Sequence, residues 1–254
     1  MSYTLYITGA GVSAESGIPT FRGNDGYWTV GSAHYTPQEM ATRQMYLSKP
    51  DEFLLWYFKR FARYRHIKPN SVHRWLSNKT LITQNIDGLD HKAGNRTFIP
   101  IHGSLDKMTL LQRQAQIPEL QNAPWDIVEE EWNSNEDENL LKKILLNAFK
   151  ISSITLKPET NTSLKPFVLL FDEYYTDLYR ITEAEHKFNT ANSFVFIGTS
   201  FNVNITSIAL RTALSRGCSI SIVDPKPIDL NIPGITYVKT TAQEYITSMQ
   251  LATD

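Results

Sequence analysis

The sequence predicts an α/β protein with a parallel sheet and a smaller, mostly helical inserted domain. Three observations lead to this fold class: strand-like segments alternate with stretches long enough for helices, the first strand-like segment runs into a glycine turn, and one internal stretch changes composition. The 254 residues, 41% hydrophobic and 20% charged, suffice to bury one large core or two smaller ones.

The first expected strand covers residues 3–8, because β-branched and aromatic residues there run directly into Gly9-Ala10-Gly11. Further strands of the parallel sheet are expected at residues 80–83, 97–101, 167–171, 193–197 and 218–223. Residues 50–64 carry apolar side chains at helical spacing and predict an amphipathic helix.

Residues 105–165 differ in composition from the rest and are interpreted as an insertion. An acidic run lies at residues 125–139, and residues 140–149 are amphipathic. Clustered like charges are typical of a solvated surface, so we expect the acidic run to face water rather than form a site.

Composition excludes several classes of protein. The 25 Lys and Arg against 26 Asp and Glu argue against a strongly basic nucleic-acid binder. The single cysteine, Cys218, excludes an intrachain disulfide and a cysteine-rich metal site. The longest apolar runs are far shorter than the ~20 residues of a membrane span. Since residues 3–8 lead into glycines instead of a signal-like apolar stretch, we expect a cytoplasmic protein.

The turn Gly9-Ala10-Gly11-Val12-Ser13-Ala14 fits a dinucleotide-binding pattern, in which glycines allow the backbone to approach phosphate. From these six residues alone, a nucleotide turn and a glycine turn without ligand carry equal weight. A dehydrogenase would have an acidic strand end about 20 residues further on. Residues 17–23 form a loop instead, which argues against an ordinary dehydrogenase.

Five motifs in order resemble the sirtuins, a family of NAD-dependent protein deacylases. They are residues 9–22, the T-Q-N-I-D of residues 83–87, the I-H-G-S of residues 101–104, the K-P-F-V-L-L-F-D-E of residues 165–173 and the G-T-S of residues 198–200. The resemblance, from about residue 3 to about residue 244, implies a Rossmann-like NAD-binding domain. We expect it to comprise residues 1–33, 71–104 and 166–254, with the small helical domain at 34–70 and 105–165.

The resemblance also implies roles for individual residues. His102 is the expected general base, since an imidazole of ordinary pKa can accept a hydroxyl proton near neutral pH. Asn85 is the second expected catalytic residue and would position the ribose or its water. The expected NAD-binding residues are Gly9, Ala10, Gly11, Ser13, Phe21, Arg22, Gln84, Asn85, Ile86, Asp87, Gly198, Thr199 and Ser200. Asp224 either binds the adenosine ribose or caps the next turn; both readings stay open.

The implied partner is an acylated lysine of a protein or peptide, with no direct nucleic acid and no membrane. Its expected contacts are Val168, Leu170, Phe171 and Val203, between which an extended peptide would add as a strand. Tyr57 and Arg60 resemble the Y-x-x-R pair of desuccinylase-type sirtuins, which implies acidic acyl groups. The same spacing is common on ordinary amphipathic helices facing solvent, so the two interpretations carry equal weight.

The sequence departs from the sirtuin pattern in two places. Residues 105–165 contain neither cysteine nor histidine, so we expect no zinc ribbon, no bound metal and an insertion held together by packing. The resemblance implies that residues 165–173 form the substrate segment, and Asp172 replaces a glycine there. The leading prediction is an NAD-dependent protein-lysine deacylase of the deacetylase or desuccinylase type. The alternative is an NAD glycohydrolase or ADP-ribosyltransferase, and a non-enzymatic nucleotide sensor is least favoured.

Overall fold

The computed structural model describes residues 3–20, 34–112, 116–133 and 136–251. Its larger sheet has six parallel strands in the order β3-β2-β1-β7-β8-β9. The strands are β1 (Thr4–Thr8), β2 (Thr80–Thr83), β3 (Ile99–Pro100), β7 (Ser193–Ile197), β8 (Ser219–Val223) and β9 (Ile235–Val238). The predicted Rossmann-like parallel sheet is therefore confirmed.

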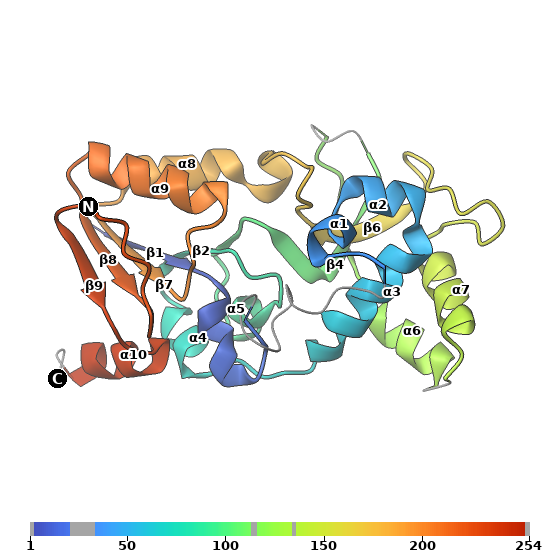
Figure 1. Ribbon diagram of the computed structural model, residues 1–254, viewed down its shortest axis with the longest axis horizontal. Coiled ribbons are helices and arrows are strands. Elements are labelled where there is room, and N and C mark those ends of the chain that lie inside the picture. Colours follow the sequence, from blue (N-terminus) through green and yellow to red (C-terminus); the bar gives the residue numbers. More distant parts are fainter. Residues whose placement is uncertain (1–2, 21–33, 113–115, 134–135, 252–254) are drawn as a thin grey trace.

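Helices cover both faces of this sheet (Figure 1). On one face lie α8 (Ile181–Thr190) and α9 (Asn204–Ser215), and on the other lie α4 (Ser71–Leu76) and α10 (Ala242–Leu251). Side chains of a strand point alternately to the two faces, so Leu5 and Ile7 pack toward α8 and α9 while Tyr6 packs toward α4 and α10. Burial on both faces explains why the central strand β7 is a nearly continuous apolar run, Phe194–Ile197.

A second lobe lies at the far end of the molecule from β9 (Figure 1). Its helical elements are α1 (Pro37–Met40), α2 (Arg43–Ser48), α3 (Pro50–Arg60), η2 (Ala62–Tyr64), α6 (Trp125–Trp132) and α7 (Glu138–Ala148). They pack against a small antiparallel sheet of β5 (Gln121–Asn122), β4 (Gly103–Leu110) and β6 (Leu164–Val168). One apolar cluster joins these helices to β4 and β6, which makes the lobe a packed unit.

Some expected elements are wrong or were missed. The segment 167–171, expected in the parallel sheet, instead contributes its first residues to β6, which pairs antiparallel with β4 in the small sheet. All five residues of β6 are buried, and such a run does not reveal from sequence which sheet it joins. Strands β4 and β9 were not expected. The helix expected over residues 50–64 ends at Arg60 and continues as the short 3-10 turn η2.

The acidic residues of the insertion that the structure describes are exposed, as expected. Within the described ranges, no helix combines the length and the apolar character that crossing a bilayer requires.

Candidate functional site

The predicted site residues come from segments that follow different strands of the parallel sheet. Gly9 follows β1, residues 84–87 follow β2, His102 follows β3, residues 198–200 follow β7 and Asp224 follows β8. Carboxyl ends of parallel strands share one edge, which is where ligands bind in open α/β sheets. The fold thus brings five separate segments to one edge of the sheet.

Two glycine turns touch each other at this edge. The backbone N–H of Gly9 donates to Ile197 O at 3.0 Å, and that of Gly11 donates to Gly198 O at 3.0 Å. A Cβ on Gly11 would lie 2.6 Å from Gly198 Cα, and Gly198 itself has a φ of +61°. The close approach of these loops requires glycine whether or not a phosphate is bound. Ala10 begins the 3-10 turn η1 (Ala10–Ser16) that follows.

Asn85, Ser13 and Asp87 form a hydrogen-bonded group beside the first turn. Asn85 is 6% exposed, and its Nδ2 donates to Gly9 O at 3.1 Å and to Ser13 Oγ at 3.2 Å. Ser13 donates to Asp87 Oδ2 at 2.7 Å, and Asp87 Oδ1 accepts from the N–H of Leu89 at 2.9 Å. These contacts hold the three side chains in one arrangement.

Two buried titratable residues, His73 and Asp90, lie next to this group of side chains. His73 Nδ1 lies 2.8 Å from Asn70 Oδ1, and burial lowers the pKa of His73 to about 4. Asp90, on α5 (Leu89–Lys92), is 2% exposed. Burial, and after it the charge of Asp87, raise the pKa of Asp90 to about 7. Sequence reasoning missed Asp90, because an acid in the first turn of a helix resembles an ordinary exposed capping residue.

Gln84 links the loops after β2 and β7. Its Nε2 donates to Thr8 O and to Thr199 Oγ1, each at 3.1 Å. Thr199 is buried, whereas Ser200 is exposed and accepts from Asn202 Nδ2 at 2.6 Å. These polar side chains therefore lie on neighbouring loops.

His102 is held by hydrogen bonds at both ring nitrogens. Nδ1 lies 2.9 Å from Gln84 O, and Nε2 lies 2.9 Å from Tyr175 Oη. Burial lowers the pKa of His102 to about 4, below the ordinary value assumed from sequence, so the ring is neutral near pH 7. Tyr175 was missed, because no sequence signal connects it with a histidine 73 residues earlier in the chain.

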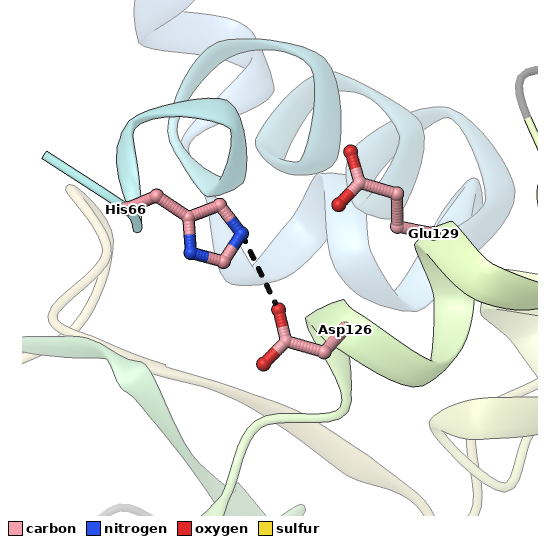
Figure 2. Close-up of side chains that lie close together, drawn as sticks. All are labelled: His66, Asp126 and Glu129. Carbon is pink, nitrogen blue, oxygen red and sulfur yellow. Dashed lines mark ion pairs between the residues drawn. The ribbon is translucent and has the colours of Figure 1, made fainter.

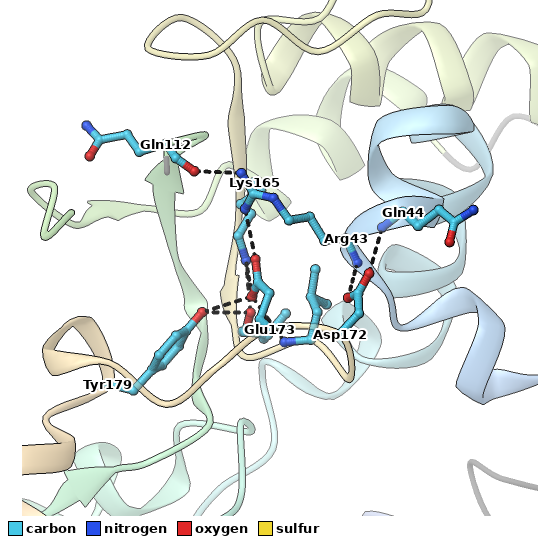
Figure 3. A network of polar contacts seen from close by, with 9 residues as sticks. Arg43, Gln44, Gln112, Lys165, Asp172, Glu173 and Tyr179 are labelled. Carbon is cyan, nitrogen blue, oxygen red and sulfur yellow. Dashed lines mark hydrogen bonds and ion pairs between the residues drawn. The ribbon is translucent and has the colours of Figure 1, made fainter. Parts of the chain in front are cut away.

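The substrate segment is tied to α2 of the small lobe (Figure 3). The Asp172 carboxylate accepts from the N–H groups of Arg43 at 2.6 Å and Gln44 at 3.0 Å. Glu173 pairs with Arg43 Nη1 at 2.9 Å and with Lys165 Nζ, itself fully buried, at 3.2 Å. The carboxylate that replaces the expected glycine therefore binds the first turn of α2.

The predicted peptide contacts differ in exposure. Val168 and Leu170 are buried, Val203 is half-buried, and Phe171 is 55% exposed. The N–H of Leu169 donates to His102 O at 2.9 Å, which joins this segment to the histidine loop. Of these four predicted contacts, Phe171 is therefore the only one whose side chain is more than half exposed.

Tyr57 and Arg60 lie on α3 in different surroundings. Tyr57 is 3% exposed, and its ring packs against Phe53 and Phe61 at centroid distances of 4.7 and 5.2 Å. The Arg60 guanidinium lies 5.6 Å from the ring centre of Trp56. The interpretation of the pair as a solvent-facing one is wrong for Tyr57.

The remaining predicted cofactor residues are placed as follows. Ile86 is half-buried, and its carbonyl accepts from Leu105 N at 2.8 Å. Asp224 accepts from the N–H of Lys226 at 2.8 Å, the capping contact that sequence analysis weighed against ribose binding. Phe21 and Arg22 lie outside the described residues.

The sequence of the insertion has neither cysteine nor histidine, and its described residues offer no fitting zinc ligands. Among the described residues, His66, Asp126 and Glu129 gather as possible metal ligands, all exposed (Figure 2). Arg65 already pairs with both carboxylates, through Nε to Asp126 at 2.6 Å and through Nη2 to Glu129. The cluster is therefore an ion-pair network between η2 and α6 in which a guanidinium supplies the positive charge.

Comparison with known proteins connects this geometry to a family. A family model described as the Sir2 family matches residues 9–205. An NAD-dependent protein deacylase of Bacteroides thetaiotaomicron is 30% identical over 235 residues, covering 90% of this chain and 88% of its own. An NAD-dependent protein deacylase 1 of Caldanaerobacter subterraneus subsp. tengcongensis is 30% identical over 249 residues, covering 95% and 90%.

Solved structures agree with these sequence relatives. A Sir2 homolog–NAD complex superposes with a TM-score of 0.71 at 28% identity, covering 97% of this chain and 87% of that one. A mutant Sir2 homologue in complex with ADP ribose superposes with a TM-score of 0.72 at 27% identity, covering 97% and 90%.

Proposed function

The chain belongs to the Sir2 family, and we propose that it is an NAD-dependent protein-lysine deacylase that transfers the acyl group from lysine to ADP-ribose. The observation that carries the proposal is that His102, with Nδ1 bonded to Gln84 O, lies at the same sheet edge as the Asn85–Ser13–Asp87 group. A base and a set of fixed polar anchors are the two parts that acyl transfer to a ribose hydroxyl needs.

The residues at this edge suit NAD. The loop backbone at Gly9, Ala10, Gly11 and Gly198 would let the phosphates and riboses approach closely, and the side chains of Gln84, Thr199 and Ser200 would supply hydrogen bonds. Asp87 offers carboxylate oxygens, and Asn85 an amide, to the carboxamide and ribose of the nicotinamide half. Bound NAD supplies the ribose carbon to which the acyl oxygen adds when nicotinamide leaves. Phe21, Arg22 and Asp224 remain proposed NAD contacts.

His102 serves as the general base in this proposal. Gln84 O can only accept, so the proton of the neutral ring is on Nδ1 and the lone pair is on Nε2. When Nε2 takes the proton of a substrate hydroxyl, the Gln84 carbonyl stabilises the imidazolium through Nδ1–H. Because burial keeps the pKa of His102 low, the ring is ready to accept a proton at any pH above about 5.

The proposed acyl-lysine peptide lies along the segment that contains Val168, Leu170 and Phe171, opposite Val203. The exposed side chain of Phe171 and the bond from Leu169 N to the His102 loop support this location. Tyr57 and Arg60 are proposed to favour succinyl or malonyl groups, since a guanidinium binds a carboxylate by charge-assisted hydrogen bonds. The proposed compartment is the cytoplasm.

The test is to incubate the purified protein with NAD, with and without an acylated peptide, and to measure nicotinamide and acyl-ADP-ribose. Peptide-dependent release of nicotinamide with formation of the acylated product is expected. Release without peptide would instead identify an NAD glycohydrolase, and release of neither product would indicate a non-catalytic nucleotide binder. Asn85→Ala and His102→Ala variants, checked for folding by circular dichroism, tie any activity to this site.

A further inference from the structure

The phenol hydroxyl of Tyr175 contacts His102 Nε2, the nitrogen that acts as the base in the proposed reaction. It lies between β6 and the 3-10 turn η3 (Asp177–Tyr179), two residues after Glu173 of the substrate segment. Its Oη is 2.9 Å from His102 Nε2, and the two rings are inclined by 31° with centroids 5.9 Å apart. The contact therefore engages the one atom of His102 that the proposed reaction needs.

The direction of this hydrogen bond follows from the contact that the other ring nitrogen, Nδ1, makes with Gln84 O. Gln84 O accepts from Nδ1–H, so Nε2 is unprotonated and Tyr175 must be the donor. Burial raises the pKa of Tyr175 to about 12, with the backbone of Ile205 acting in the opposite direction, so the phenol keeps its proton near pH 7. The proton order is thus Tyr175 Oη–H to Nε2, and Nδ1–H to Gln84 O.

An imidazole nitrogen has a single in-plane lone pair, and Tyr175 uses it. A substrate hydroxyl that gives its proton to His102 must either displace the phenol or pass the proton through it. Tyr175 is held against displacement: its ring packs on the apolar cluster that contains Ile205 and Ala209 of α9. The next residue is fixed as well, because Thr176 O accepts from Tyr179 N at 2.9 Å.

We propose that Tyr175 is a further catalytic residue, a phenol relay that carries the proton from the substrate hydroxyl to His102. Oη accepts the proton of the substrate hydroxyl while its own proton moves to Nε2, so the phenol ends neutral. His102 becomes imidazolium, and the electron pair of the broken O–H bond stays on the substrate oxygen that attacks the acyl carbon. This inference rests on the proposed deacylase function.

The decisive variant is Tyr175→Phe, which removes only the hydroxyl. Acyl transfer at saturating substrates should fall by about 10²-fold, the lower end of the scale of one acid–base contribution. Exchange of labelled nicotinamide into NAD, which precedes the proton transfer, should change by less than about twofold, and KM for NAD by less than about threefold. In a His102→Ala background the second substitution should have no further effect, because residues that act as a unit are not additive.

Tyr174→Phe is the matched control, since it removes the hydroxyl of the neighbouring tyrosine, whose side chain is 75% exposed, and should leave both rates unchanged. Equal losses of exchange and transfer in Tyr175→Phe would assign the phenol to binding or structure and overturn the relay. Faster transfer would show that the phenol blocks the base, and unchanged transfer would show a spectator; either result overturns the relay too.

A readout independent of turnover separates this inference from the proposed function. In the ligand-free protein, the ¹⁵N resonance of His102 Nε2 should move toward that of an unbonded lone pair in Tyr175→Phe, while Nδ1 stays protonated. An unmoved Nε2 resonance overturns the relay even if the wild type is an active deacylase. A wild type without nicotinamide exchange overturns the proposed function, and the relay with it, even if the resonance moves.

Discussion

Replacing Asp90 with asparagine should make the free energy of unfolding less sensitive to rising pH. In the folded state the pKa of this carboxyl is about 7 instead of 3.8, first because it is buried and then because Asp87 lies nearby. Between those two values the folded state holds a proton that the unfolded state has lost, so stability falls as pH rises from about 4 to about 7. At 1.36 kcal/mol per pH unit, the loss is on the order of 4 kcal/mol.

The assay is urea unfolding of wild type and Asp90→Asn at pH 5, 6, 7 and 8. The stability of the variant relative to wild type should grow with pH and level off above pH 7. The lowered pKa values of His73 and His102 have the opposite effect: because of them, the free energy of unfolding decreases as pH falls below about 6.5. They are present in both proteins, so their contribution cancels in the difference.

Asp229→Asn, at an exposed carboxylate, is the control for the loss of one negative charge. A pH-independent difference for Asp90→Asn would refute the reasoning, because it would mean that Asp90 is ionised in the folded protein throughout this range.

Four further predictions concern the site and the small lobe. His102→Ala should lower acyl transfer by about 10²- to 10⁴-fold with unchanged circular dichroism; near-normal transfer would remove it as the base. Wild type should use succinyl- or malonyl-peptide more efficiently than acetyl-peptide, and Arg60→Met should abolish that preference; an acetyl preference in the wild type contradicts the assignment. Strong chelators should change neither activity nor melting temperature, since residues 105–165 lack cysteine and histidine; one equivalent of tightly bound zinc would contradict this. Lys165→Met should destabilise the fold by about 3–5 kcal/mol in urea unfolding by leaving buried Glu173 with one cation fewer, and a loss below about 1 kcal/mol would contradict it.

Much of the parallel sheet was predictable because its signals are local. Strands β1, β2, β7 and β8 are short apolar runs bounded by glycine, polar residues or helix-length gaps, and each was expected within one or two residues. β6 was assigned to the wrong sheet, since pairing partners far apart in sequence decide sheet membership. β9 was missed because its four residues are only partly buried or exposed and lack a continuous apolar pattern.

Only those residues of the candidate site that belong to sequence motifs were predictable. Asn85, Asp87 and His102 were recognised from short sequence patterns, and the fold brings their segments to one sheet edge. Asp90 and Tyr175 were not, because the property that distinguishes each arises from tertiary packing. Burial gives Asp90 its raised pKa, and the path of the loop after β6 brings Tyr175 Oη to His102.

Packing in the small lobe also helps to fix the backbone next to His102, the proposed base. Trp125 is 2% exposed, donates from Nε1 to Leu105 O at 2.5 Å and packs its ring 5.2 Å from that of Phe149. Strand β4, which contains Leu105, begins at Gly103, the residue after His102. Gly103 has a φ of +85°, and a Cβ there would lie 2.1 Å from Phe167 O of β6. Since His102 adjoins this tight β4–β6 contact, side-chain packing in the small lobe is connected to the His102 ring, the proposed base, through one peptide bond.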